Sequence, residues 1–216
     1  MSSRKISFWR KIVNGLSSFI VRLCGLRLDV NGLEKLPEGG YLLVSNHVSM
    51  FDPIILLHLL KRQAPLFVSK PENFKIPIAG ALMKKCGFLA IDRENPRNAI
   101  RTIYAAAEQV REGNPMVIYP EGTRNKTPEN GLLPFHNGVF KIAKRAGVPV
   151  AVAVVTGTDR VKGNAPLKKT AVALQIVDVI GEDFVKANND SGIGERVRSS
   201  METYLAKLNR PDQNIA

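Results

Sequence analysis

The chain has 216 residues, 44% hydrophobic and 23% charged, a composition that excludes a disordered protein and leaves room for one domain but little for a second. With 31 Lys and Arg against 19 Asp and Glu, the formal charge of +12 predicts an anionic partner: a membrane surface, a phosphorylated substrate or a nucleic acid. Cys24 and Cys86 lack metal-ligand spacing and are expected to be reduced, structural thiols.

Residues 1–27 form a basic, amphipathic segment, and the first acid in the chain is Asp29. Apolar residues recur every three or four positions, which is the period of one helical face: Ile6, Trp9, Ile12, Val13, Leu16, Phe19, Ile20 and Leu23. Such a helix suits an anionic membrane surface, where each Lys or Arg contributes roughly 1 kcal/mol. It would also fit a first helix packed on the core. The segment is too short in apolar residues to span a bilayer, and a cleavable signal is not expected.

Beyond residue 27, short apolar runs alternate with helical patterns. Strands are expected at residues 41–44, 66–68, 88–91, 116–119, 148–155 and 171–180, and helices at residues 54–60, 78–85, 98–111, 139–145 and 195–208. Asp52 and Pro53 should open the first of these helices as its N-cap and first helical residue. The pattern predicts a single α/β domain, residues 28–216, with a largely parallel central sheet flanked by helices.

Polar segments follow three of the expected strands, and ligands of such sheets gather beyond the carboxyl ends of the strands. The segments are Asn46-His47 after the first strand, Asp92-Arg93 after the third and Glu121 to Arg124 after the fourth. We therefore expect them to meet at one edge of the sheet and to form a single site.

His47 and Asp52 are the candidate catalytic pair. A neutral imidazole can remove the proton of a hydroxyl whose oxygen attacks a carbonyl, which typically contributes about 10²–10⁴ in rate. A carboxylate on the other ring nitrogen fixes the tautomer. No Gly-x-Ser-x-Gly elbow is present, so we expect a substrate hydroxyl to attack directly, without an acyl-enzyme. Taken alone, the pair would equally fit a polar strand end and a helix cap.

Candidate binding groups lie in the neighbouring segments. Arg93 and Arg124 suit a phosphate, which arginine binds through paired, charge-assisted hydrogen bonds, although either alone would fit a solvated loop charge. Backbone amides around Gly122-Thr123 can stabilise an oxyanion. Lys70, after the second strand, either adds positive potential to the site or is simply solvated.

In order and spacing, these segments resemble the glycerolipid acyltransferase family, and within it the bacterial lysophosphatidic acid acyltransferases. The family carries an Asn-His-x4-Asp block, a Gly-x-x-x-Ile-Asp-Arg-like block, a Phe/Tyr-Pro-Glu-Gly-Thr-Arg block and a Val-Pro block. These are matched in turn by residues 46–52, 87–93, 119–124 and 148–150. The resemblance covers about residues 28–160.

The resemblance implies transfer of a fatty acyl group from acyl-CoA or acyl carrier protein to the free hydroxyl of lysophosphatidic acid. The product would be phosphatidic acid, made in phospholipid synthesis at the cytoplasmic face of the cell membrane by a peripheral or monotopic protein. The resemblance implies His47 as base, Asp52 as its partner, and neither metal nor cofactor. It assigns the glycerol phosphate to Arg93, Glu121, Gly122 and Arg124.

Other functions remain open. The same chemistry could act on glycerol phosphate or another lysophospholipid, or His47 could activate water in a lipid esterase. A non-enzymatic basic binder is a third class, but a nucleic-acid partner is not expected because no stacking platform or reading helix is visible. Two departures from the family pattern bear on the substrate: Val152 stands where a second proline is usual, and His136 where a lysine is common.

Overall fold

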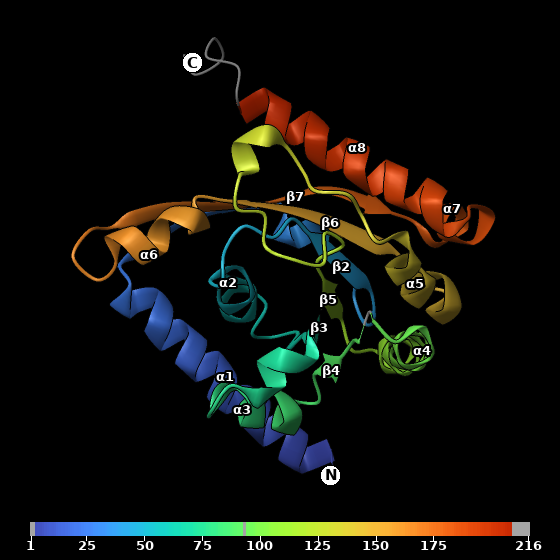
Figure 1. Cartoon of the computed structure of the whole chain (residues 1–216), viewed down its shortest axis with the longest axis horizontal. Helices are drawn as coiled ribbons and strands as arrows, with labels where there is room; N and C mark the ends of the chain where they lie inside the picture. Colours follow the sequence, from blue (N-terminus) through green and yellow to red (C-terminus); the bar gives the residue numbers. More distant parts are fainter. Residues whose placement is uncertain (1–2, 93, 209–216) are drawn as a thin grey trace.

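A seven-stranded sheet separates two layers of helices (Figure 1). The computed structural model describes residues 3–92 and 94–208. The strands are β1 (Leu26–Asn31), β2 (Leu42–Ser45), β3 (Leu66–Ser69), β4 (Leu89–Ala90), β5 (Met116–Ile118), β6 (Val150–Thr156) and β7 (Thr170–Ile180). The helices are α1 (Ser3–Leu23), α2 (Asp52–Leu59), α3 (Ala79–Cys86), α4 (Pro96–Arg111), α5 (Lys141–Ala146), α6 (Val161–Asn164), α7 (Glu182–Ala187) and α8 (Asp190–Leu208).

The strand order in the sheet is β1-β7-β6-β2-β5-β3-β4. Every neighbouring pair is parallel except β6 and β7, which confirms the predicted α/β class and the largely parallel sheet. Strand β1 was not anticipated. It pairs with β7 in parallel, from Leu26 opposite Thr170 to Asn31 opposite Gln175.

The sheet buries apolar side chains on both faces. In β2, Leu42 and Val44 belong to a core cluster that also contains residues of α4, α5 and α8. Leu43, between them, belongs to a second cluster with residues of α1, α2 and α6. Because central strands alternate their side chains between two cores, they read as continuous apolar runs in the sequence.

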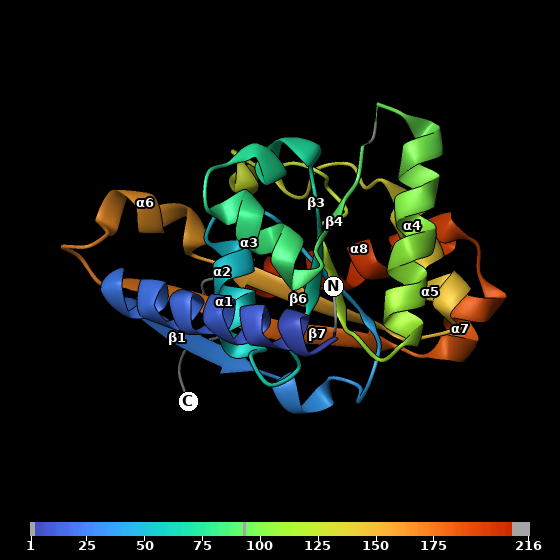
Figure 2. The ribbon, with the colours of Figure 1, turned by 90° about the horizontal axis from the view of Figure 1, so that it is seen from below.

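Helix α1 is confirmed, and it has two different faces. Its inner face packs on α2 and α3 (Figure 2), with Val21 buried. Arg10 anchors it by donating hydrogen bonds to the Cys86 carbonyl (3.3 Å) and the Asn114 side chain (3.0 Å). Its outer face is an apolar stripe that stays exposed: Phe8, Ile12, Leu16, Phe19 and Leu23. Within the described part of the chain, no helix is long and apolar enough to cross a membrane.

The carboxyl ends of the parallel strands lie at one edge of the sheet, as predicted. Strand β2 ends there at Ser45, between β5, which ends at Ile118, and β6, which ends at Thr156. Strands β3 and β4 continue the same parallel array beyond β5. The loops that leave these strands therefore meet around the residues that follow β2.

Candidate active site

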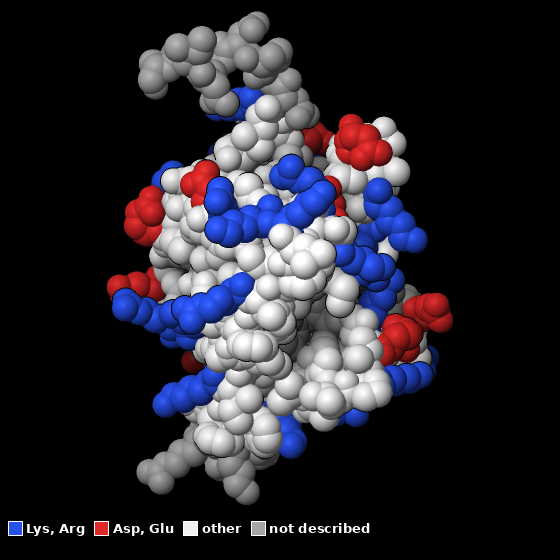
Figure 3. Space-filling model, turned by 90° about the vertical axis from the view of Figure 1, so that its left-hand side faces the viewer, with Lys and Arg blue, Asp and Glu red and all other residues white. Residues whose placement is uncertain are grey.

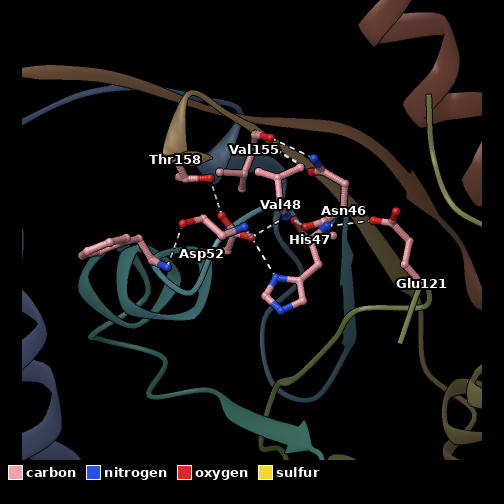
Figure 4. A network of polar contacts seen from close by, with 10 residues as sticks. Asn46, His47, Val48, Asp52, Glu121, Val155 and Thr158 are labelled. Atoms are coloured by element: carbon pink, nitrogen blue, oxygen red, sulfur yellow. Dashed lines mark hydrogen bonds and ion pairs between the residues drawn. The ribbon is translucent and has the colours of Figure 1, made fainter. Parts of the chain in front are cut away.

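His47 and Asp52 form a hydrogen-bonded pair directly after β2. His47 Nδ1 lies 2.8 Å from Asp52 Oδ2, and the His47 side chain is 17% exposed while that of Asp52 is fully buried. Figure 4 shows the second ring nitrogen of His47 pointing away from Asp52. The pair thus has the geometry of a base whose tautomer is set by a buried carboxylate, with Nε2 left to face a substrate.

The role expected for Asp52 as an N-cap is wrong. Helix α2 begins at Asp52 itself, and no side chain caps it. The carboxylate turns back instead: Oδ2 accepts hydrogen bonds from the amides of Val48 and Ser49, each at 2.8 Å, and Oδ1 accepts one from the Thr158 hydroxyl at 2.5 Å. These bonds fix the carboxylate on His47, which a helix cap would not need.

Tyr119 holds the plane of the imidazole. Its ring stacks on that of His47 with the centroids 4.1 Å apart and the planes at 18°. The Tyr119 hydroxyl is buried and has no hydrogen-bond partner among the described residues. Burial, and then the charge of Asp52, raise the pKa of Tyr119 well above its usual value. The phenol therefore stays neutral and acts on His47 by contact.

Two asparagines fasten the loop that carries His47. The buried side chain of Asn46 donates to the Val155 carbonyl (2.9 Å) and accepts from the Val155 amide (2.8 Å), which joins the loop to β6 (Figure 4). The backbone N–H of Asn125 donates to the His47 carbonyl at 2.7 Å. Both faces of the loop are thus tied to separate parts of the chain.

Glu121 is part of the same scaffold. Its side chain is buried, and it accepts hydrogen bonds from the amides of His47 (2.8 Å) and Leu133 (2.9 Å). Burial raises the pKa of Glu121, and these two amides partly offset that shift. The structure therefore places Glu121 where it joins the loop of His47 to the segment after β5.

The expected binding residues converge on His47. A cavity of about 150 Å³ is lined by His47, Lys70, Tyr119, Gly122, Thr123 and Arg124, together with residues at the end of β3. In the described part of the chain, no acidic side chain lines this smaller cavity. A second cavity of about 610 Å³ shares Lys70, Gly122 and Thr123 with the first and extends to Asp92 and His136. The smaller cavity is cationic and concave, which suits an anionic substrate. The larger cavity is also lined by acidic side chains: Glu72, Asp92, Glu94 and Glu121.

The backbone amides after β5 differ in their use. The Gly122 amide donates to the Tyr119 carbonyl at 3.0 Å in a tight turn, where Gly122 has a φ of +71°. Within the described chain, the Thr123 amide donates to no other group. Of the two amides expected to stabilise an oxyanion, that of Thr123 is the one with no backbone acceptor among the described residues.

Arg93, a predicted phosphate ligand, lies outside the described residues, although its neighbours Asp92 and Glu94 line the larger cavity. His136, the first departure from the family pattern, also lines that cavity. Val152, the second, is buried in β6 among the core residues between the sheet and α8. It lines neither cavity at His47.

Sequence reasoning missed Thr158 and Tyr119 as site residues. The signal for Thr158 was present: β6 runs parallel to β2, so the residues after its end lie at the same edge of the sheet. The rule that selected His47 and Glu121 would have selected Thr158 as well. Tyr119 lay inside a matched block, but its stacking on His47 depends on how β2 and β5 pair, which the sequence does not show.

Among the described residues, no group of three or more His, Cys, Asp and Glu side chains is arranged to hold a metal ion. Both cysteines are free thiols, with Cys86 buried.

Comparison with known proteins places these residues in a family. Residues 27–156 match the family described as "Acyltransferase". The chain is 36% identical over 137 residues to the chloroplastic 1-acyl-sn-glycerol-3-phosphate acyltransferase of Brassica napus, which covers 62% of this chain but 39% of that protein. It is 29% identical over 207 residues to the 1-acyl-sn-glycerol-3-phosphate acyltransferase of Helicobacter pylori, covering 94% of this chain and 86% of that one.

A solved structure shares the fold. It is the 1-acyl-sn-glycerophosphate acyltransferase PlsC of Thermotoga maritima, which superposes with a TM-score of 0.77 over 99% of this chain and 86% of that one. The sequence identity is 22%, so the likeness concerns the architecture: helices on both sides of one mainly parallel sheet.

Proposed function

Because this chain belongs to the acyltransferase family, we propose that it transfers a fatty acyl group from acyl-CoA or acyl carrier protein to the free hydroxyl of lysophosphatidic acid. The product is phosphatidic acid, an intermediate of phospholipid synthesis. The observation that carries the proposal is the His47–Asp52 pair, bonded at 2.8 Å beside a cationic cavity. The names of the Brassica and Helicobacter relatives support this acceptor.

In the proposed mechanism, His47 Nε2 takes the proton of the acceptor hydroxyl as that oxygen attacks the thioester carbonyl. The buried Asp52 carboxylate stabilises the imidazolium through Nδ1. The Thr123 amide donates to the oxyanion of the tetrahedral intermediate. When the intermediate collapses, the thiolate leaves with the proton returned by His47, so no acyl-enzyme forms and no cofactor is needed.

The acceptor phosphate binds at the cationic side of the cavity. Arg124 and Lys70 line it, and Arg93, which lies outside the described residues, is proposed as a further phosphate ligand. The guanidinium of Arg124 pairs with phosphate oxygens through two hydrogen bonds, and Lys70 adds charge. Glu121 and Gly122 contribute by shaping the loop that presents Thr123 and Arg124.

A donor-by-acceptor activity assay on the purified protein with lipid present tests the reaction. We expect His47→Ala to lower kcat by about 10²–10⁴ while the protein keeps its fold, as measured by circular dichroism, since His47 is not part of a core cluster. His58→Ala is the matched control and should retain activity. Substantial turnover in His47→Ala would refute the assignment of the base.

The acceptor is tested separately. Arg124→Ala should raise the KM for lysophosphatidic acid by tenfold or more, because a charge-assisted phosphate contact contributes about 1.5–3 kcal/mol. Arg97→Ala, an exposed arginine of α4 that lines neither cavity at His47, should leave the KM unchanged. An unaltered KM in Arg124→Ala would remove Arg124 from the phosphate site. Glycerol phosphate and other lysophospholipids complete the panel, and release of free fatty acid in place of a new ester would indicate an esterase.

The proposal includes docking on an anionic membrane through α1, as a peripheral or monotopic protein at the cytoplasmic face. Its support is the exposed apolar stripe, in which Phe8 and Phe19 are 58% and 60% exposed. Leu16→Glu with Phe19→Glu should abolish flotation with anionic liposomes, since burying a charge in the interface is unfavourable. Leu208→Glu, an exposed leucine of α8 on the opposite side of the sheet (Figure 1), should float normally. Equal flotation of both variants would exclude α1 as the docking element.

A further inference from the structure

A groove separate from the catalytic cavities lies between α1 and α2. Its volume is about 600 Å³, and it is lined by Gly15, Ser18, Phe19 and Arg22 of α1, and by His58 and Lys61 at the end of α2. Ser18 Oγ and His58 Nδ1, which both line the groove, are 2.8 Å apart. The groove shares no lining residue with the cavities at His47, so the acyl transfer described above leaves it without a role.

The charges of the groove have one sign. Arg22 and Lys61 are exposed, and neither side chain forms an ion pair or hydrogen bond with any residue that the structure describes. Among the residues that the structure describes, no Asp or Glu lines the groove. Figure 3 shows one side of the molecule, on which Lys and Arg side chains, together with some Asp and Glu side chains, surround a largely uncharged area. Two unpaired cations over a concave surface favour an anion.

The groove is continuous with the apolar stripe of α1. Phe19 belongs to both, since it lines the groove and is 60% exposed. A ligand that sits between Arg22 and Lys61 therefore has apolar surface directly beside it. Inorganic phosphate or a soluble phosphate ester would use only the two cations, whereas a phospholipid would use the cations and Phe19 together.

We propose that this groove binds the headgroup phosphate of one anionic phospholipid of the bilayer, with Arg22 and Lys61 on the phosphate and the acyl chains along Phe19. This lipid is neither the acceptor nor the product held at His47. It orients the protein on the membrane, because it fixes a headgroup between α1 and α2. The inference rests on the proposed docking through α1 and extends it from a general attraction to a defined site.

The test measures binding of the full-length protein to vesicles of phosphatidylglycerol in phosphatidylcholine, with no acyl donor present. Trp9 in α1 is the only tryptophan of the chain and reports binding by its fluorescence. Arg22→Gln with Lys61→Gln removes the two groove cations. Lys168→Gln with Lys169→Gln removes the same charge from the connection before β7, outside the groove. Gly15→Gln fills the groove without changing charge; open space surrounds a Cβ at Gly15, and glutamine favours a helix more than glycine does.

We expect the groove double variant to weaken binding at least tenfold more than the Lys168/Lys169 control, and Gly15→Gln to weaken it as well. Equal losses in the two double variants, with none in Gly15→Gln, would overturn the site and leave only general electrostatic attraction. Displacement of the vesicles by millimolar glycerol phosphate would assign the groove to a soluble anion and also overturn it. If the protein does not dock through α1, all of these variants should bind the vesicles as tightly as the wild-type protein does. If the proposed acyl transfer is wrong, the result of this binding assay does not change.

Discussion

Thr158 supplies the hydrogen-bond donor to the second oxygen of the buried Asp52 carboxylate. Thr158 is fully buried, and its hydroxyl donates to Asp52 Oδ1 while His47 and two amides share Oδ2. It lies two residues beyond the stretch, 27–156, that matches the family. A residue outside the matched motifs thus takes part in fixing the proposed catalytic pair.

Thr158→Val should lower kcat about tenfold with little change in KM. Valine keeps the shape but leaves one carboxylate oxygen without its donor, so Asp52 can turn away from His47; the loss of a hydrogen bond to a charged group contributes about 1.5–3 kcal/mol. Thr158→Ser should restore kcat, since it restores the hydroxyl. A valine variant with wild-type kcat, or with a raised KM alone, would show that Thr158 does not position the pair.

Removing the hydroxyl of Tyr119 should increase the stability of the protein. It is buried and has no partner in the described part of the chain, and an unsatisfied buried hydroxyl costs about 1–3 kcal/mol. Tyr119→Phe should therefore raise the free energy of unfolding by about 1 kcal/mol, measured by urea titration, and keep kcat within about twofold because the ring still stacks on His47. A large loss of activity would instead mean that the hydroxyl contacts the substrate.

At the scale of elements, the packing of α1 on α2 should depend on pH through His58. Burial, and then the charge of Lys61, lower the pKa of His58. The unfolded chain then binds the proton more readily than the folded one, so the stability that neutral His58 contributes is present above about pH 6.5 and is lost as the pH falls. Ser18 Oγ is the group bonded to its Nδ1.

Urea unfolding at pH 7.5 and 5.5 measures this dependence. We expect the wild-type protein to lose more stability between these values than His58→Gln, which cannot titrate. The comparison is needed because the raised pKa of Glu121 acts in the other direction, favouring the folded state as the pH falls. Identical losses in the two proteins would show that His58 does not link α1 packing to pH.

The elements also show what the sequence could and could not predict. Apolar runs in β2, β5 and β6 identified the buried strands because both of their faces are covered. Strand β1 shows the alternating burial of an edge strand. This pattern is weaker than a continuous apolar run, and β1 comes directly after a helix, so the sequence did not predict it. For α1 the period was right, but its apolar residues differ in exposure: Val13 is partly buried, whereas Phe19 is exposed. Only the packing of α1 on α2 and α3 reveals this difference.

At the scale of the whole molecule, the net charge of +12 should make membrane association dependent on salt. The Debye length falls from about 10 Å at 0.1 M to about 3 Å at 1 M, so the attraction between exposed Lys and Arg side chains and anionic lipid is screened. We expect binding to anionic vesicles to weaken at least tenfold over this range, as measured by flotation. Binding that does not change with salt would mean that the apolar stripe of α1 alone holds the protein.

The pairing of β1 with β7 constrains when the first helix can be placed. Strand β1 begins three residues after α1 ends, and its partner segment Thr170–Gln175 comes much later in the chain. At ribosomal rates of about 5–20 residues per second, α1 and β1 are made on the order of ten seconds before β7, the strand with which β1 pairs. During that interval the exposed stripe of α1 is present without the finished domain, so the docking proposed for α1 does not have to wait until the catalytic site has formed.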